Sequence, residues 1–169
     1  MTEEIINRIA NSKLITIDLE ESYPKGRRMV VDIKNWLFQE LILKENDFRE
    51  AVNNHDWNQY QNAYVSLICS SDAIIPSWAF LLISTKLTFV AKKTVVGDLQ
   101  LLETVLFHEI INQLDTSIYK DKPVIIKGCT NKPIPASAYS FLIEKIQPVV
   151  KSLMFGEACS TVPLFKVSK

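Results

Sequence analysis

Three cysteines are the residues of this chain whose type and surroundings are best suited to chemistry. Cys69, Cys129 and Cys159 each follow an apolar segment and stand directly before a serine or threonine. Two of them lie in similar phrases, LICSSDAIIPSWAF at 67–80 and IKGCTNKPIPASAY at 126–139. Both phrases run through a Cys and a polar loop to Ile-Pro-x-x-Ala-aromatic. Such positions favour a functional site over simple core packing, although a small Cys at a strand end is also a common core residue.

Metal binding is the first chemistry that these thiols suggest. Zinc takes four Cys or His ligands in a tetrahedron, and iron–sulphur clusters are held by Cys thiolates. The candidate ligands are Cys129, Cys159, Cys69 and His108. No C-x₂-C pair is present, so each ligand would come from a different part of the fold. The alternative is an exposed, unliganded His108, because this residue belongs to a polar i, i+4 stripe of the kind that faces solvent.

A thiol nucleophile is the second interpretation, and a protein-interaction module is the third. A reactive Cys needs a pKa lowered by a nearby base or a helix N-terminus. Cys129 after Gly128 is the best candidate, with His108 as its base. In the third interpretation the cysteines are purely structural, and aromatic residues such as those at 36, 57 and 78 form an interface.

The elements that position these residues can be predicted from periodicity and turn chemistry. Apolar alternation and compact apolar runs predict strands, and period-3.6 patterns predict helices. The predicted strands are 13–19, 28–33, 63–68, 123–127, 153–155 and 163–167, and the first two could pair as a hairpin. The predicted helices are 2–10, 34–53, 76–87, 99–114 and 135–150, and TFV at 88–90 favours a further strand. If the strands before Cys69 and Cys129 are parallel in one sheet, both loops lie at the edge where α/β sheets bind ligands.

The composition narrows the class of protein. Nineteen basic and nineteen acidic residues cancel, and the small basic clusters are too few for the footprint that nucleic-acid binding requires. The acidic start, MTEEIINRIANSK, is no secretory signal, and no apolar run is long enough for a membrane span. Three cysteines, an odd number, argue against a disulfide scaffold, so we expect a cytoplasmic protein without nucleic-acid or membrane partners.

The sequence also resembles a known family over nearly the whole chain. The matching segments are TIDLEESYPKGRRMVVDIKNWLFQELILKENDFREAV, SSDAIIPSWAFLL, VIIKGCTNKPIPASAY and KSLMFGEACSTVPLFK. They are similar to an uncharacterised bacterial family catalogued as domain of unknown function 2480. The family carries no established reaction. Its members are often encoded beside iron–sulphur cluster assembly genes, so the resemblance implies a role, and a protein partner, around iron–sulphur biogenesis.

We therefore expect an α/β (or α+β) fold in one domain over 1–169. Its mixed sheet would have about five to six strands with packed helices, and two β-loop-α units would carry Cys69 and Cys129. The leading functional hypothesis is a cytoplasmic protein accessory to iron–sulphur or metal handling through its loop cysteines. The alternatives are a small-molecule enzyme with Cys129 as nucleophile and an interaction module. The apolar helix 99–114 leaves a homodimer open.

Overall fold

Two of the helices begin directly after the Ile-Pro pairs, and each follows a buried strand. In the computed structural model, which describes residues 14–128, 131–157 and 159–168, β3 (Tyr64–Ile68) precedes α2 (Ser77–Leu87) and β5 (Pro123–Ile126) precedes α4 (Ala136–Ile146). The α/β class is thus confirmed, with Cys69 in the first connection. The second connection includes Cys129, which lies outside the described residues, so that detail stays a prediction.

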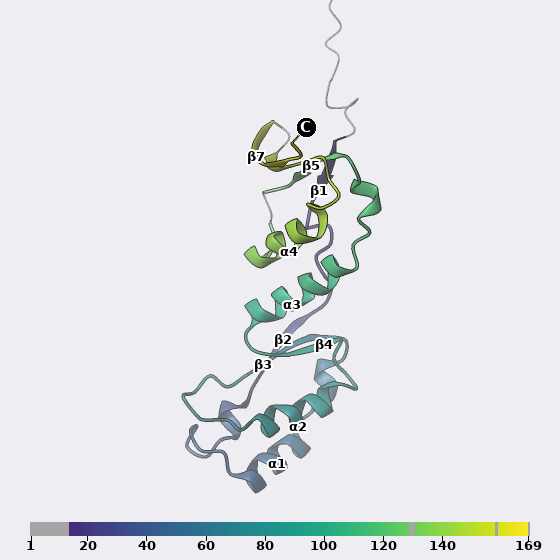
Figure 1. The fold of residues 1–169 in the computed structure, drawn as a ribbon. Coiled ribbons are helices and arrows are strands. Elements are labelled where there is room, and N and C mark those ends of the chain that lie inside the picture. Colours follow the sequence, from purple (N-terminus) through teal and green to yellow (C-terminus); the bar gives the residue numbers. More distant parts are fainter. Residues whose placement is uncertain (1–13, 129–130, 158, 169) are drawn as a thin grey trace, which may run out of the picture. The chain divides into compact units, whose positions relative to one another are not determined.

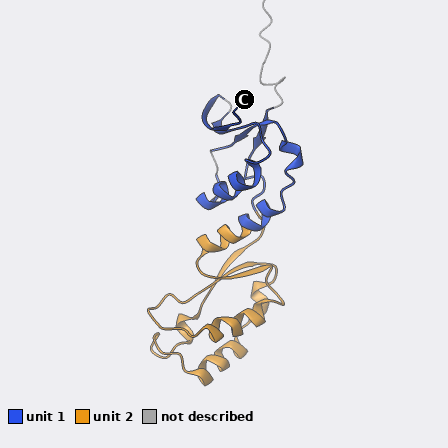
Figure 2. Ribbon diagram, in the orientation of Figure 1, with its two compact units in different colours: residues 1–23, 107–169 blue, residues 24–106 orange. Residues whose placement is uncertain are grey.

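The chain divides into two compact units, drawn in different colours in Figure 2. Unit 1 comprises residues 1–23 and 107–169, and unit 2 comprises residues 24–106. In sequence, unit 2 is inserted into unit 1 after β1, and α3 (Leu99–Asn112) contributes residues to both units. The single domain expected over residues 1–169 stays a prediction.

Unit 2 contains a parallel sheet in the order β2-β3-β4. The remaining elements of this unit are β2 (Arg28–Asp32), η1 (Ile33–Trp36), α1 (Glu45–Asn54), η2 (Trp57–Tyr60) and β4 (Lys93–Val96). Helices α1 and α2 lie side by side in Figure 1 and share one apolar core with the strands. Buried residues from both elements, such as Phe48 and Ile83, close that core over the strand residue Leu67.

Unit 1 contains a mixed sheet in the order β1-β5-β6-β7, in which β7 alone is antiparallel. Its further elements are β1 (Ile15–Ile17), η3 (Ser117–Tyr119), β6 (Ser152–Glu157) and β7 (Ser160–Lys166). The core lies between the sheet and two helical segments, the end of α3 and α4, and includes Phe107, Leu142 and Val124. Among the described residues, no helix is both long and apolar enough to cross a membrane.

Several predicted details are wrong. The strands β1 and β2 do not form a hairpin, because β1 pairs in parallel with β5 and β2 in parallel with β3. The strands consequently form two sheets, with β3 and β5 in different ones. The predicted strand 88–90 is the turn after α2, and β4 follows it. The predicted helix 34–53 is interrupted by a tight turn with positive φ at Gln39 and Glu40, before α1 begins.

The two units share one internal plan. From α1 to β4, residues of unit 2 match residues of α3 to β6 at a constant offset of 59 positions (Phe48 to Phe107). The buried positions coincide in both cores, as in the pairs Phe48 and Phe107, Val52 and Ile111, Tyr60 and Tyr119, Val65 and Val124, Ala79 and Ala138, and Ile83 and Leu142. The helices α2 and α4 have the same length and the same offset. This agreement is too regular for two unrelated βαβ units.

Backbone details confirm the correspondence. Asn62 and Asp121 have φ of 58° and 57°, and each donates its N–H over 2.8 Å to a valine carbonyl, Val90 or Val149. The strands β1 and β2 correspond at a shorter offset. Asp18 and Asp32 close equivalent turns, in which the carboxylate accepts the backbone N–H two residues on, at 2.9 and 3.0 Å. The two units thus share one fold, and in the sequence unit 2 is inserted into unit 1 after β1.

Candidate ligand site

The predicted metal ligands are placed in separate surroundings where the structure describes them. Cys69 follows β3 in unit 2, and its half-buried thiol lies 3.2 Å from the Ser71 hydroxyl. Cys159 is exposed in the turn between β6 and β7 of unit 1. By the common offset, Cys69 corresponds to Gly128 and not to Cys129, which lies outside the described residues. The two phrases therefore place their cysteines one position apart.

His108 is exposed on α3, as its polar stripe indicates. Its ring packs edge-on against Phe141, with centroids 5.0 Å apart, and the Asn112 amide lies 3.3 Å from the ring nitrogens. Among the described residues, no group of three or more His, Cys, Asp or Glu side chains is arranged to hold a metal ion. A ligand set that includes Cys129 stays a prediction.

A different feature of unit 1 has the properties of a site, at the carboxyl end of β1. Asp18 ends this strand and accepts hydrogen bonds from the Glu20 backbone N–H at 2.9 Å and the Lys127 ammonium at 2.7 Å. The hydrogen bond from Lys127 lowers the pKa of Asp18, and the same contact raises the pKa of Lys127. Asp18 is therefore ionised at neutral pH, and its hydrogen bonds with Lys127 and Glu20 fix the start of the turn at 19–22.

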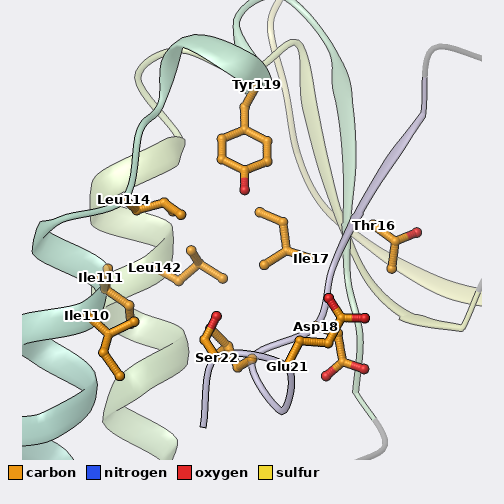
Figure 3. Close-up of a pocket in the computed structure, with 11 residues that line it drawn as sticks. Thr16, Ile17, Asp18, Glu21, Ser22, Ile110, Ile111, Leu114, Tyr119 and Leu142 are labelled. Carbon is orange, nitrogen blue, oxygen red and sulfur yellow. The ribbon is translucent and has the colours of Figure 1, made fainter. Parts of the chain in front are cut away.

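Beside Asp18 lies a cavity of about 120 Å³. Figure 3 shows its lining, which is polar on the side of the 19–22 turn and aliphatic on the side of α3 and α4. The lining residues are Thr16, Ile17, Asp18, Leu19, Glu21, Ser22, Ile110, Ile111, Leu114, Tyr119 and Leu142. All of them belong to unit 1. The lining combines apolar walls with polar groups in about equal measure, and such a combination can bind a small polar molecule.

The hydroxyl of Tyr119 faces the aliphatic part of the cavity. Tyr119 is only 7% exposed, and Figure 3 shows its hydroxyl pointing towards Leu142 and Ile17 across the cavity. No described residue forms a hydrogen bond with this oxygen. Burial, and secondarily the charge of Asp115, raises the pKa of Tyr119, so the phenol stays protonated at neutral pH. It is a hydrogen-bonding group for a ligand and not a base.

The equivalent tyrosine in unit 2 has a partner. Tyr60 is also buried, and its hydroxyl lies 2.9 Å from Nε2 of His55. The His55 ring is enclosed by Trp36 and Trp57, with centroid distances of 5.1 and 4.7 Å. Unit 2 therefore fills with its own rings the space beside its tyrosine.

Unit 1 carries smaller or aliphatic side chains at those positions. Leu114 stands at the position of His55, and Ser22 stands at the position of Trp36 by the offset that relates Asp18 to Asp32. Leu114 and Ser22 both line the cavity. The cavity is thus lined at the two positions where the sister unit carries an imidazole and an indole. Sequence reasoning missed it because the echo was followed only through the cysteine phrases. The pair Tyr60 and Tyr119 at the same offset was the available signal.

The comparisons with known proteins identify the family. The family model described as protein of unknown function DUF2480 matches residues 3–167. The searches of curated proteins and of solved structures returned no match. The chain belongs to the DUF2480 family, as the resemblance of its sequence predicted.

Proposed function

We propose that this protein binds a small polar molecule in the cavity of unit 1. The observation that carries the proposal is the hydroxyl of Tyr119, a largely buried residue, which points into the cavity and has no hydrogen-bond partner among the described residues. No buried side-chain nitrogen or oxygen among the described residues lacks a hydrogen-bond partner, so this hydroxyl is accessible to solvent and free to bond to a ligand. A ligand with one hydrogen-bonding atom would supply that partner.

The size of the cavity supports a ligand over a single water. One water takes about 30 Å³ of liquid volume and needs two to four polar partners, whereas an apolar cavity of about 150 Å³ holds benzene. The cavity here has about 120 Å³. Its deep end offers a single hydroxyl among Ile17, Leu114 and Leu142. A compact molecule of roughly five or six non-hydrogen atoms fits this volume.

The surrounding groups favour binding over catalysis. The only ionised side chain fixed at the site by a hydrogen-bonded partner that the structure describes is Asp18, and Lys127 already occupies it. Tyr119 is held protonated, so it can orient a ligand without exchanging a proton with it at neutral pH. The cavity thus supports recognition through one directional hydrogen bond and apolar contact.

The test is a titration followed by ¹H–¹⁵N amide shifts on untagged protein. The probes are imidazole, cyclopentanol, acetamide and ethylamine, each added separately. We expect at least one probe to shift the amides of Leu114 and Tyr119 in a saturable way. The double variant Ser22→Trp with Leu114→His, which copies the filling of unit 2, should abolish this response. Ser140→Trp, a matched change at an exposed position of α4, should preserve it.

Either of two results would remove the proposal. The first is the absence of saturable shifts at these amides with every probe. The second is a response that Ser22→Trp with Leu114→His leaves unchanged in a folded protein. Tyr119→Phe provides an independent test, because it removes only the hydroxyl. It should weaken the binding of each probe that forms a hydrogen bond with this group.

A further inference from the structure

The space beside the buried tyrosine has a known occupant in unit 2. There the imidazole of His55 stacks on Tyr60, with an interplanar angle of 27° and ring centroids 5.7 Å apart. Its Nε2 meets the tyrosine hydroxyl at 2.9 Å, and the rings of Trp36 and Trp57 pack edge-on against it. The shared fold therefore accommodates a flat five-membered ring at this position when one is present.

Burial determines the chemical state of that occupant. Desolvation lowers the pKa of His55, with a smaller opposing effect from Asp56. The imidazole is thus held neutral, with one ring nitrogen as an acceptor and the other as a donor. A neutral heterocycle and a protonated phenol form a complementary pair, because the phenol can donate to the acceptor nitrogen.

Unit 1 keeps the tyrosine and lacks the ring. Tyr119 is buried as Tyr60 is, whereas the position of His55 is occupied by Leu114, which has no hydrogen-bonding atom in its side chain. Resting on the proposed function, we infer that the ligand is a small neutral nitrogen heterocycle of imidazole size. Its ring nitrogen accepts the hydrogen bond of the Tyr119 hydroxyl.

The walls and the mouth of the cavity agree with this class. Ile17, Leu114 and Leu142 present aliphatic surfaces to the space in front of the hydroxyl, which suits the faces of a flat ring. The polar side, formed by Glu21 and Ser22 in the 19–22 turn, is exposed and leaves room for a substituent on the ring. The Glu21 carboxylate there would repel an anionic substituent.

The experiment compares two five-membered rings at about pH 8, above the pKa of roughly 6.5 of an imidazole side chain. Imidazole is the probe, and cyclopentanol is the control of similar size with a hydroxyl in place of the ring nitrogens. Amide shifts of Leu114 and Tyr119 report the affinity of each. We expect imidazole to bind at least fivefold more tightly than cyclopentanol. Tyr119→Phe should weaken imidazole about five- to tenfold, as expected for the loss of one hydrogen bond of about 1–1.4 kcal/mol.

A matched variant in unit 2 provides a positive control. His55→Ala removes the resident imidazole and leaves its place beside Tyr60 empty. Imidazole at millimolar concentration should bind there, shift the amide of Tyr60 and restore part of the lost stability, whereas cyclopentanol should do so less.

The outcomes separate this inference from the proposed function. Cyclopentanol binding to the wild-type protein as tightly as imidazole, or imidazole binding that Tyr119→Phe does not weaken, overturns the heterocycle and leaves a small-molecule site. No response to any of the four probes overturns both.

Discussion

Removing the hydroxyl of Tyr60 and removing that of Tyr119 should have unequal effects on stability, although the two residues occupy equivalent positions. Tyr60→Phe deletes a hydrogen bond of 2.9 Å to His55. Tyr119→Phe deletes a hydroxyl that has no partner among the described residues. Both substitutions keep the aromatic ring, so neither opens the core of its unit. The two variants therefore compare a hydroxyl that has a protein partner with one that has none among the described residues.

The expected magnitudes follow from burial and partners. Loss of a buried hydrogen bond typically costs about 0.5–1.5 kcal/mol, and more when the remaining partner is left unsatisfied. The Gln59 amide lies 3.3 Å from Nε2 of His55 and would keep part of that partner satisfied. We therefore expect Tyr60→Phe to destabilise unit 2 by about 1 kcal/mol. Tyr119→Phe should change the free energy of unfolding of unit 1 by less than roughly 0.5 kcal/mol, because its hydroxyl has no hydrogen bond to a described residue that could be lost.

Native-state hydrogen exchange measures the two units separately in the intact chain. Amides of the central strands serve as reporters, Val65 and Leu67 for unit 2 and Val124 and Ile126 for unit 1. The protection of the β3 amides should fall about fivefold in Tyr60→Phe, and that of the β5 amides should stay nearly the same in Tyr119→Phe. Equal losses in the two variants would refute the reasoning, because Tyr119 would then have a stabilising protein partner.

Four further results are expected. Burial lowers the pKa of His55, so the unfolded chain binds a proton at this residue more readily than the folded chain does. The free energy of unfolding of unit 2 should therefore be highest above pH 6.5 and fall as the pH drops below that value. Urea titrations at several pH values should show a flatter profile for His55→Gln. Lys127→Met should raise the pKa of Asp18 towards 3.8, as carboxylate NMR titration would show. Gly156→Ala should destabilise unit 1 by more than about 1 kcal/mol, because φ is +123° and the new Cβ would lie 2.5 Å from the first carbonyl oxygen of β7; chemical denaturation measures this. The metal-handling prediction requires bound zinc or iron in untagged protein and less of it in Cys159→Ser; elemental analysis without either metal would end it.

Local sequence patterns were sufficient to predict the strand before, and the helix after, each Ile-Pro pair. The strands before Cys69 and Gly128, and the helices after Pro76 and Pro135, were predicted because each combines a short β-rich run with a Pro that fits a helix start. The echo between the two phrases correctly indicated a shared β-loop-α plan. These signals are local, so they need no knowledge of which strands pair.

Strand pairing could not be predicted in the same way. The hairpin expected from β1 and β2 was plausible because a Pro-Lys-Gly turn joins them, but each strand pairs in parallel with a distant strand. A parallel partner leaves no trace in the connecting loop. The turn at 38–42 was missed for a related reason, because Gln39 and Glu40 take positive φ without the Gly or Asn that usually signals it.

The cavity was harder still, because it is defined by what unit 1 lacks relative to unit 2. A serine at 22 and a leucine at 114 are unremarkable alone, and they gain meaning only beside Trp36 and His55 at the same positions of the repeat. Recognising them required the exact offsets, which the structure supplied through matched turns and hydrogen bonds.

The repeat also explains how unit 1 can lack the aromatic rings that pack beside the tyrosine in unit 2 and still fold. The core positions that the units share, such as Phe48 with Phe107 and Ala79 with Ala138, lie between the helices and the sheet, whereas the cavity lies at the edge of this core, between the turn that follows β1 and residues such as Leu142. A change of the ring-bearing residues there alters the space beside the tyrosine without removing the shared core. Unit 2 shows that the plan is stable with the space filled by its own side chains. In unit 1 the tyrosine is retained while its partner is absent, which is the arrangement expected when the partner comes from solution.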